Sequence, residues 1–363
     1  MPELLKDRYN AAFVERLSIR LKDAYPSFDI QAFTAAVFDA NWPKRELKDR
    51  MRHFSTCLHQ AVPEHYAQQL EIFKQVIWEG QALELMFFPD FVELYGMENL
   101  QTSLAALEYF TPFASAEFAI RPFLLKYPEA GLQQMITWSK HSNLHLRRLA
   151  SEGCRPRLPW AMALKDYQKD PSPILPILHQ LYQDESEYVR RSVANNLNDI
   201  SKDHPELAYS IAKEWLQKDP SKNTRRLVKH ALRGLLKQGH TQALLLFGFA
   251  DPQDIQVVKV SQSKNRLAIG DTLSFQVELE NTAKTAQLIR LEYGIDFVKK
   301  NGKTSRKVFQ WSEKEIEPGI HSWSKQQAFA NLSTRKHYPG THRLWILVNG
   351  QSKGHLDFDL IQG

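Results

Sequence analysis

A short internal repeat constrains the fold of this 363-residue chain more than any other feature of its sequence. Three eight-residue stretches align without gaps, and each ends in a pair of arginines: residues 141–148 (HSNLHLRR), 184–191 (DESEYVRR) and 219–226 (DPSKNTRR). The stretches are 43 and 35 residues apart, which brackets the period of HEAT-like repeats with two helices each. Stacked helix pairs of this kind form an α-solenoid with a concave face.

The hydrophobic pattern predicts helices before residue 250 and strands after it. In the first part apolar residues recur every three or four positions between short proline-containing breaks, as in residues 10–24, 64–77, 103–110, 132–139 and 188–201. In the second part short runs rich in Val, Ile, Phe, Trp and Thr alternate with turn signals, at residues 254–260, 272–280, 288–296, 307–312, 321–329, 343–348 and 356–360. Seven such strands are typical of an immunoglobulin-like sandwich.

We therefore predict a mainly α fold, a HEAT-like α-solenoid over residues 1–250, followed by a small all-β immunoglobulin-like sandwich over residues 251–363. The only cysteines are Cys57 and Cys154, too few for a disulfide framework or a structural zinc site. No apolar run approaches the ~20 residues of a membrane-spanning helix, and residues 1–8 lack the apolar core of a signal peptide. We expect a cytoplasmic monomer, nucleoid-associated if bacterial, with no cofactor, metal or membrane partner.

Common catalytic motifs are absent from the sequence. It contains no phosphate-cradling glycine loop, no Gly-x-Ser-x-Gly elbow and no His-Glu-x-x-His helix. The thirteen histidines are scattered without the spacing of metal ligands. These absences exclude several enzyme classes and favour a solenoid over a nucleotide-binding sheet.

Basic residues are unevenly distributed. The net charge is +6, and residues 251–363 carry 16 lysines and arginines against 12 acids. Residues 220–250 contain no acid, and five cations there recur every three or four positions, as along one helix face: Lys222, Arg226, Lys229, Arg233 and Lys237. This stripe indicates contact with phosphates, with an ordinary solvated face as the alternative. The turn at residues 299–303 is likewise either a phosphate contact or a solvated hairpin loop.

The paired arginines lie close to acids in the sequence. The first arginine of each pair, Arg147, Arg190 or Arg225, is expected to have a structural role. Helical spacing places Glu152 one turn after Arg148, and Asp199 two turns after Arg191. On a concave face such arginines hold a backbone while the carboxylates point between them. Spacing alone favours the simpler interpretation, that these are intrahelical ion pairs.

Three longer strings resemble the AlkC group of DNA alkylation-repair glycosylases. They are residues 115–123 (SAEFAIRPF), 147–160 (RRLASEGCRPRLPW) and 188–205 (YVRRSVANNLNDISKDHP). The resemblance extends over the solenoid and the C-terminal sandwich, where residues 335–342 (RKHYPGTH) resemble a loop of that group.

The resemblance implies hydrolysis of the N-glycosidic bond of N3-alkylated bases, chiefly 3-methyladenine and also 3-methylcytosine. The implied partner is double-stranded DNA that contains alkylated bases. The lesion is expected to be read within the duplex, without base flipping. A base alkylated on a ring nitrogen is already cationic and leaves without protonation, so the enzyme has to stabilise an oxocarbenium-like sugar and position a water.

The acids within the matching strings are Glu117, Glu152 and Asp199, which we expect to be catalytic. In this hypothesis Glu152 and Asp199 flank the sugar, and Glu117 lies beside the lesion. The residues expected to contact DNA are Arg148, Arg155, Trp160, Arg191, Lys229, Arg233, Arg335, Lys336, His337 and Tyr338. The alternative for Trp160 is a buried structural role. The alternative for the loop of residues 335–342 is a plain connection between strands.

Two other functions fit the same sequence. One is a non-catalytic scaffold that binds proteins through its repeats and its sandwich, a common role of solenoids. The other is a structure-selective DNA binder without activity. Release of bases from methylated DNA distinguishes both from a glycosylase.

Overall fold

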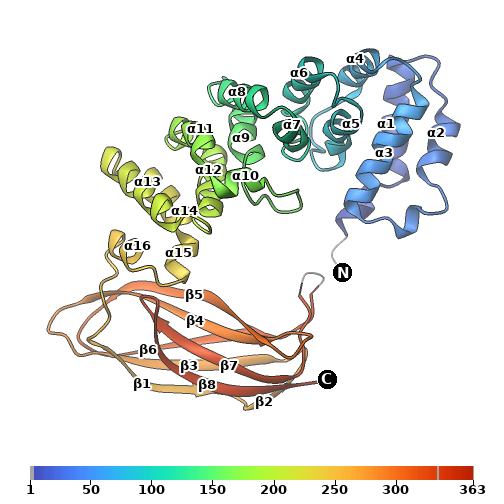
Figure 1. Cartoon of the computed structure of the whole chain (residues 1–363). Helices are drawn as coiled ribbons and strands as arrows, with labels where there is room; N and C mark the ends of the chain where they lie inside the picture. Colours follow the sequence, from blue (N-terminus) through green and yellow to red (C-terminus); the bar gives the residue numbers. More distant parts are fainter. Residues whose placement is uncertain (1–3, 333–334, 363) are drawn as a thin grey trace. The chain divides into compact units, whose positions relative to one another are not determined.

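The computed structural model describes residues 4–332 and 335–362 (Figure 1). Helices continue as far as Leu246, and strands follow from Ile255. The predicted class, a helical solenoid followed by an all-β Ig-like sandwich, is confirmed. Within the described ranges, every helix is too short or too polar to cross a lipid bilayer.

The chain divides into two compact units. One comprises Met1–His204 with Trp215–Ala231, and the other comprises Pro205–Glu214 with Leu232–Gly363. The last two helices therefore group with the strands. The domain limit expected at residue 250 stays a prediction.

The helices are short, and a proline lies in the first turn of several of them, as in α8, α11 and α13. The α-helices are α1 (Ala11–Ala24), α2 (Ile30–Val37), α3 (Leu47–Ala61), α4 (Tyr66–Val76), α5 (Phe87–Tyr95), α6 (Leu100–Phe110), α7 (Ile120–Lys126), α8 (Pro128–Trp138), α9 (Leu144–Gly153), α10 (Lys165–Lys169), α11 (Leu175–Leu181), α12 (Glu187–Ile200), α13 (Pro205–Lys218), α14 (Lys222–Ala231), α15 (Arg233–Lys237) and α16 (Thr241–Leu246). The 3-10 helices are η1 (Leu5–Arg8), η2 (Trp42–Lys44), η3 (Glu84–Met86) and η4 (Ser172–Ile174). The five predicted helices correspond to α1, α4, α6, α8 and α12.

Each repeat signature lies at the start of a helix. The three stretches run into α9, α12 and α14, and the Asn143 side chain caps α9 by accepting a hydrogen bond from the His145 amide at 2.8 Å. Arg147 reaches into the next repeat, where its Nε donates to Asp184 at 2.6 Å. Arg190 instead donates to the backbone carbonyl of Glu185 in its own turn at 2.8 Å. Both first arginines therefore hold the turns of the stack.

The basic stripe is not continuous, so the prediction of one helix face is wrong. Helix α14 ends at Ala231, and α15 begins at Arg233 after a turn at Leu232. The periodicity assumed an unbroken helix, but Gly234, a poor helix former, follows this turn directly. Lys229 and Arg233 therefore lie on two different helices.

The C-terminal strands form two sheets. They are β1 (Ile255–Gln262), β2 (Arg266–Ala268), β3 (Thr272–Asn281), β4 (Gln287–Val298), β5 (Thr304–Ile316), β6 (Gly319–Ala328), β7 (Gly340–Val348) and β8 (Gln351–Ile361). The first sheet has the order β1-β3-β6 and the second β2-β8-β7-β4-β5; among these pairs only β2 and β8 are parallel. All seven predicted strands are present, and the three-residue β2 was missed.

The core of the sandwich forms from alternate residues of each strand. In β3, Leu273, Phe275, Val277 and Leu279 are buried while their neighbours point outward. They pack against the inner face of the second sheet, as in the ring contact between Phe275 and Tyr293 at 5.2 Å. The two sheets are therefore held together without a disulfide, because both cysteines lie in the helical part of the chain.

Candidate active site

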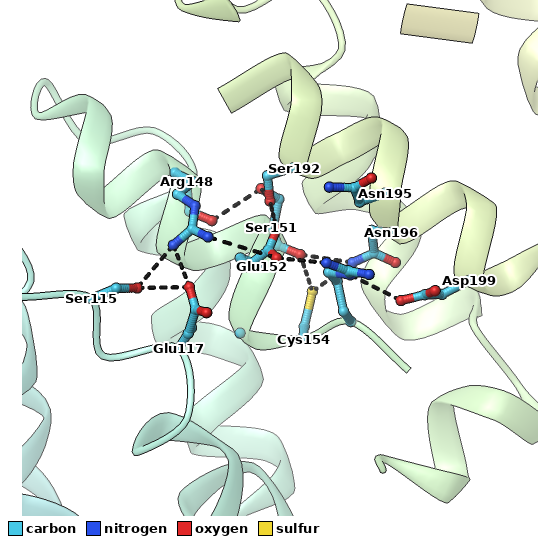
Figure 2. Close-up of polar contacts among 12 residues, drawn as sticks. Ser115, Glu117, Arg148, Ser151, Glu152, Cys154, Ser192, Asn195, Asn196 and Asp199 are labelled. Atoms are coloured by element: carbon cyan, nitrogen blue, oxygen red, sulfur yellow. Dashed lines mark hydrogen bonds and ion pairs between the residues drawn. The ribbon is translucent and has the colours of Figure 1, made fainter. Parts of the chain in front are cut away.

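Three neighbouring elements of the solenoid bring the predicted acids together. Glu117 lies in the corner before α7, Glu152 in the last turn of α9, and Asp199 in the last turn of α12. These positions are widely separated in sequence, but the repeat stack places them in one row, as Figure 2 shows. The predicted convergence of Glu152 and Asp199 is therefore present in the structure.

Two arginines alternate with the three acids to form a continuous chain of ion pairs. Arg148 pairs with Glu117 and lies 3.7 Å from Glu152. Arg155 donates to Glu152 at 2.6 Å and to Asp199 at 2.9 Å. We call these five residues the acid–arginine row. The contacts of Arg148 with Glu117 and of Arg155 with Asp199 join different elements of the stack. Of the two intrahelical pairs in the simpler alternative, Arg148 with Glu152 is present, whereas the partners of Asp199 are Arg155 and Lys202.

The row becomes more buried from Glu117 towards Asp199. The exposed fraction of the side chain falls from 15% for Glu117 to 7% for Glu152 and 2% for Asp199. Burial alone would lower the pKa of Arg148, but the carboxylates of Glu117 and Glu152 outweigh it and hold that pKa above its usual value. The pKa of Arg155 is raised against burial in the same way, by Glu152 and Asp199. Both arginines therefore stay charged.

The carboxylate oxygens differ in how many donors they meet. Glu152 accepts from Arg155 on Oε1 and from the Ser192 hydroxyl on Oε2 at 2.6 Å. Asp199 accepts from Arg155 on Oδ2 and from Lys202 on Oδ1 at 3.0 Å. Glu117 accepts hydrogen bonds from Ser115 and Arg148, and both bonds go to its Oε2 atom. Within residues 4–332 and 335–362, Oε1 of Glu117 accepts no hydrogen bond.

Arg155 was predicted to contact DNA, and that assignment is wrong. Its side chain is only 8% exposed, and its guanidinium is held by two buried carboxylates. Sequence reasoning counted its charge without knowing that the acids surround it. Arg155 instead joins the two acids.

The other solenoid cations that were predicted to contact DNA are exposed or half-buried. Arg191 is exposed and lines a recess of about 210 Å³ between α12 and α14, together with Arg226 and His230. Lys229 and Arg233 are half-buried. Contact of Arg191, Lys229 and Arg233 with DNA stays a prediction.

Two aromatic residues lie near the row. Trp160 is 65% exposed, so the alternative of a buried structural tryptophan is wrong. Tyr188, at the start of α12, lies under the Arg148 guanidinium at 5.0 Å from the ring centre. Sequence analysis missed Tyr188, Ser115 and Ser192 as members of this region. Ser115 and Ser192 are each within two residues of a singled-out residue, which was the available signal.

The sandwich carries a second basic region. A recess of about 380 Å³ is lined by residues including Lys299, Lys307, Arg335, Lys336 and Tyr338. Burial lowers the pKa of Lys307, and the nearby charges of Arg335, Lys237 and Lys299 lower it further. This crowding of cations is typical of a surface that attracts anions.

His337 also lines this recess, but most of its side chain is buried. It is 4% exposed and packs its ring against Phe297 and Phe329, and burial lowers its pKa. Contact of His337 with DNA stays a prediction. Contact of Arg335, Lys336 and Tyr338 with DNA also stays a prediction.

Comparisons with family models agree with this architecture. Residues 102–235 match the model described as DNA alkylation repair enzyme, and residues 256–362 match the model described as uncharacterised protein YhaZ, C-terminal Ig-like domain. The fold and these matches define the chain as a helical-repeat protein of the DNA alkylation-repair class.

Two individual proteins match nearly the whole chain. The uncharacterised protein YhaZ of Bacillus subtilis is 42% identical over 98% of this chain and 99% of its own length. The structure of Pseudomonas fluorescens alkylpurine DNA glycosylase AlkC, bound to DNA containing an abasic site analog, is 37% identical and covers 99% of this chain and 100% of its own, with a TM-score of 0.92. The chain belongs to the family that includes AlkC and YhaZ.

Proposed function

We propose that this protein is a DNA glycosylase that removes N3-alkylated bases, 3-methyladenine and 3-methylcytosine, from double-stranded DNA by hydrolysis. The observation that carries the proposal is the acid–arginine row. A row of buried carboxylates that runs across several repeats has no evident use in a protein-binding scaffold. The full-length similarity to AlkC, a DNA glycosylase whose solved structure is bound to DNA, supports the same function.

The charge of the row suits the reaction. Three carboxylates face two buried arginines, and Lys202, which also contacts Asp199, is largely exposed. The row taken alone therefore carries one excess negative charge, and the charge of the fully buried Arg121 also acts on Glu117 and Asp199. A cationic base departs as a neutral molecule and leaves positive charge on the sugar, which a fixed carboxylate in a partly dehydrated site stabilises. No group has to protonate the base, which is consistent with acids that are paired with arginines.

The geometry favours Glu117 as the acid that meets the substrate. Its Oε1 is open, while both oxygens of Glu152 and of Asp199 are already engaged. Glu117 then faces the sugar or orients the attacking water, and Glu152 and Asp199 supply the field behind it. This differs from the initial hypothesis, in which Glu152 and Asp199 flanked the sugar.

DNA is held by cations outside the row. Arg191 on the solenoid and Arg335 and Lys336 on the sandwich contact backbone phosphates, which gives salt-sensitive binding without sequence readout. A lesion read within the duplex, without base flipping, is consistent with this arrangement.

Incubation with methylated DNA, followed by identification of the released bases, tests the function directly. Glu117→Gln keeps the shape of the side chain but removes its charge, so the single-turnover rate should fall by roughly 10²–10³-fold. Binding to undamaged duplex should be unchanged. Glu129→Gln, at an exposed position at the start of α8, is the matched control. No release of base by the unaltered chain would reject the function, and a Glu117→Gln variant with normal rates would reject the assignment of Glu117.

A further inference from the structure

The loop between α9 and α10 is rigidly held and presents Trp160 to solvent. Arg121, fully buried, donates to the carbonyls of Gly153 and Arg155 at 2.8 Å each and to that of Met162 at 2.6 Å. These bonds fix both ends of the loop. The position of Trp160 is therefore set by the fold and is not that of a loose side chain.

Trp160 is held in an unfavourable conformation. Its φ is +66°, in the left-handed region that large side chains rarely adopt. Its ring is 65% exposed, although Trp160 borders an apolar recess of about 320 Å³ lined by residues including Met51, Met86, Phe118 and Leu158. An indole ring gains free energy by leaving water for such a recess. Some contact must therefore keep the ring out of it.

Lys48 makes that contact. Its Nζ donates to the backbone carbonyl of Trp160 at 2.8 Å and lies 4.7 Å from the centre of the Phe118 ring. The first bond fixes the peptide that follows the strained residue. The second is a cation–π contact beside Glu117, the acid assigned above to the substrate. One side chain on α3 thus connects the Trp160 loop to the reactive end of the acid–arginine row.

We propose that Lys48 is a positioning residue that holds Trp160 exposed, so that its ring packs against the DNA sugar or backbone beside the alkylated nucleotide. This role rests on the proposed function. Because the ring is already in place, DNA binding does not have to order it, and a pre-organised aromatic contact contributes more to affinity than a mobile one. Lys48 acts through Trp160 and does not itself contact the DNA.

The first test measures the loop without DNA. Lys48→Met keeps the aliphatic stem and removes the ammonium group. Hydrogen exchange of residues 157–163 should then become faster, and the fluorescence of Trp160, taken as the difference from Trp160→Phe, should shift to shorter wavelength as the ring enters the recess. Lys48→Arg should restore both, and Lys44→Met, at a nearby exposed lysine, should change neither. Unchanged exchange and emission in Lys48→Met would overturn the proposal.

The second test separates the two ways in which Lys48 can affect DNA binding. Lys48→Met should raise the half-saturating concentration of methylated duplex about tenfold, the effect of one hydrogen bond to a charged group, with the rate at saturation little changed. In a Trp160→Ala background the same substitution should have no further effect. An equal loss in that background, with a salt slope reduced by about one, would instead show direct contact with a phosphate and overturn the proposal. If the unaltered chain releases no base, the proposed function fails, while the exchange and fluorescence results still decide the role of Lys48.

Discussion

Replacing Arg155 by methionine tests whether the acid–arginine row is held together as its geometry indicates. The guanidinium lies 2.6 Å from Glu152 and 2.9 Å from Asp199, with 8% of the side chain exposed. Removing one partner of a buried ion pair typically costs about 3–5 kcal/mol, because it leaves an uncompensated charge. Here each acid keeps a second cation, Arg148 at 3.7 Å and Lys202 at 3.0 Å. We therefore expect the lower end, about 3 kcal/mol.

A neighbouring arginine provides the matched control. Arg157 pairs with Asp203 at 2.7 Å, but its side chain is 39% exposed, and such surface pairs contribute about 0–1 kcal/mol. Urea unfolding followed by far-ultraviolet circular dichroism gives the free energy of unfolding of Arg155→Met and Arg157→Met by linear extrapolation. Arg155→Met should be the less stable variant by about 2 kcal/mol or more.

A variant in which Arg155 and both of its acids are neutral separates the cost of unpaired buried charges from the cost of lost packing. Combining Arg155→Met with Glu152→Gln and Asp199→Asn removes both orphaned charges, so most of the lost stability should return, because neutral replacements of buried ion pairs are often tolerated. Excision should be slow even so, since two of the three carboxylates of the row are gone. The reasoning is refuted if Arg155→Met is as stable as Arg157→Met, or if the triple variant is no more stable than Arg155→Met.

Two predictions concern the sandwich. Arg335→Glu with Lys336→Glu should weaken DNA binding equally for all sequences and reduce the salt slope by about two. Lys284→Glu, a charge reversal at an exposed position elsewhere on the sandwich, is the control. If the affinity and salt slope of the double variant equal those of the control, the loop is not part of the DNA interface. Burial lowers the pKa of His342, so below about pH 6.5 the unfolded chain binds more protons than the folded one, and stability should be complete above that pH and fall as the pH decreases. His342→Gln should flatten this dependence in urea unfolding measured across that range, and an unchanged slope would contradict it.

Periodicity predicted the architecture well because it reports local burial. The helices α1 and α12 and the alternating strand β3 follow from the spacing of their apolar residues. The strand β2 has three residues and pairs only with β8, so it carries too few positions to show alternation. The prediction of one basic helix face from Lys222 to Lys237 was wrong because regular spacing was taken as proof of an unbroken helix.

The contacts between side chains of different repeats could not be predicted from the sequence. Resemblance singled out Glu117, Glu152 and Asp199, and their convergence required only that the repeats stack. That Arg155 lies between two of them, or that Lys48 reaches Trp160 across 112 positions of the chain, depends on distances that no spacing rule contains. The inward side chain of His337 likewise depends on how its loop crosses the end of the sheets.

The alternation of acids and arginines resolves a conflict within the proposed site. A site that stabilises a developing cation needs ionised carboxylates away from water, yet neighbouring buried carboxylates repel one another and favour protonation. Each arginine placed between two acids offsets the repulsion between their charges and joins neighbouring elements of the repeat stack. The row begins with Glu117, whose Oε2 meets Ser115 and Arg148. On the proposed mechanism the positive sugar of the transition state continues the alternation at Oε1, so the arrangement that stabilises the fold also leaves one place for the reacting charge.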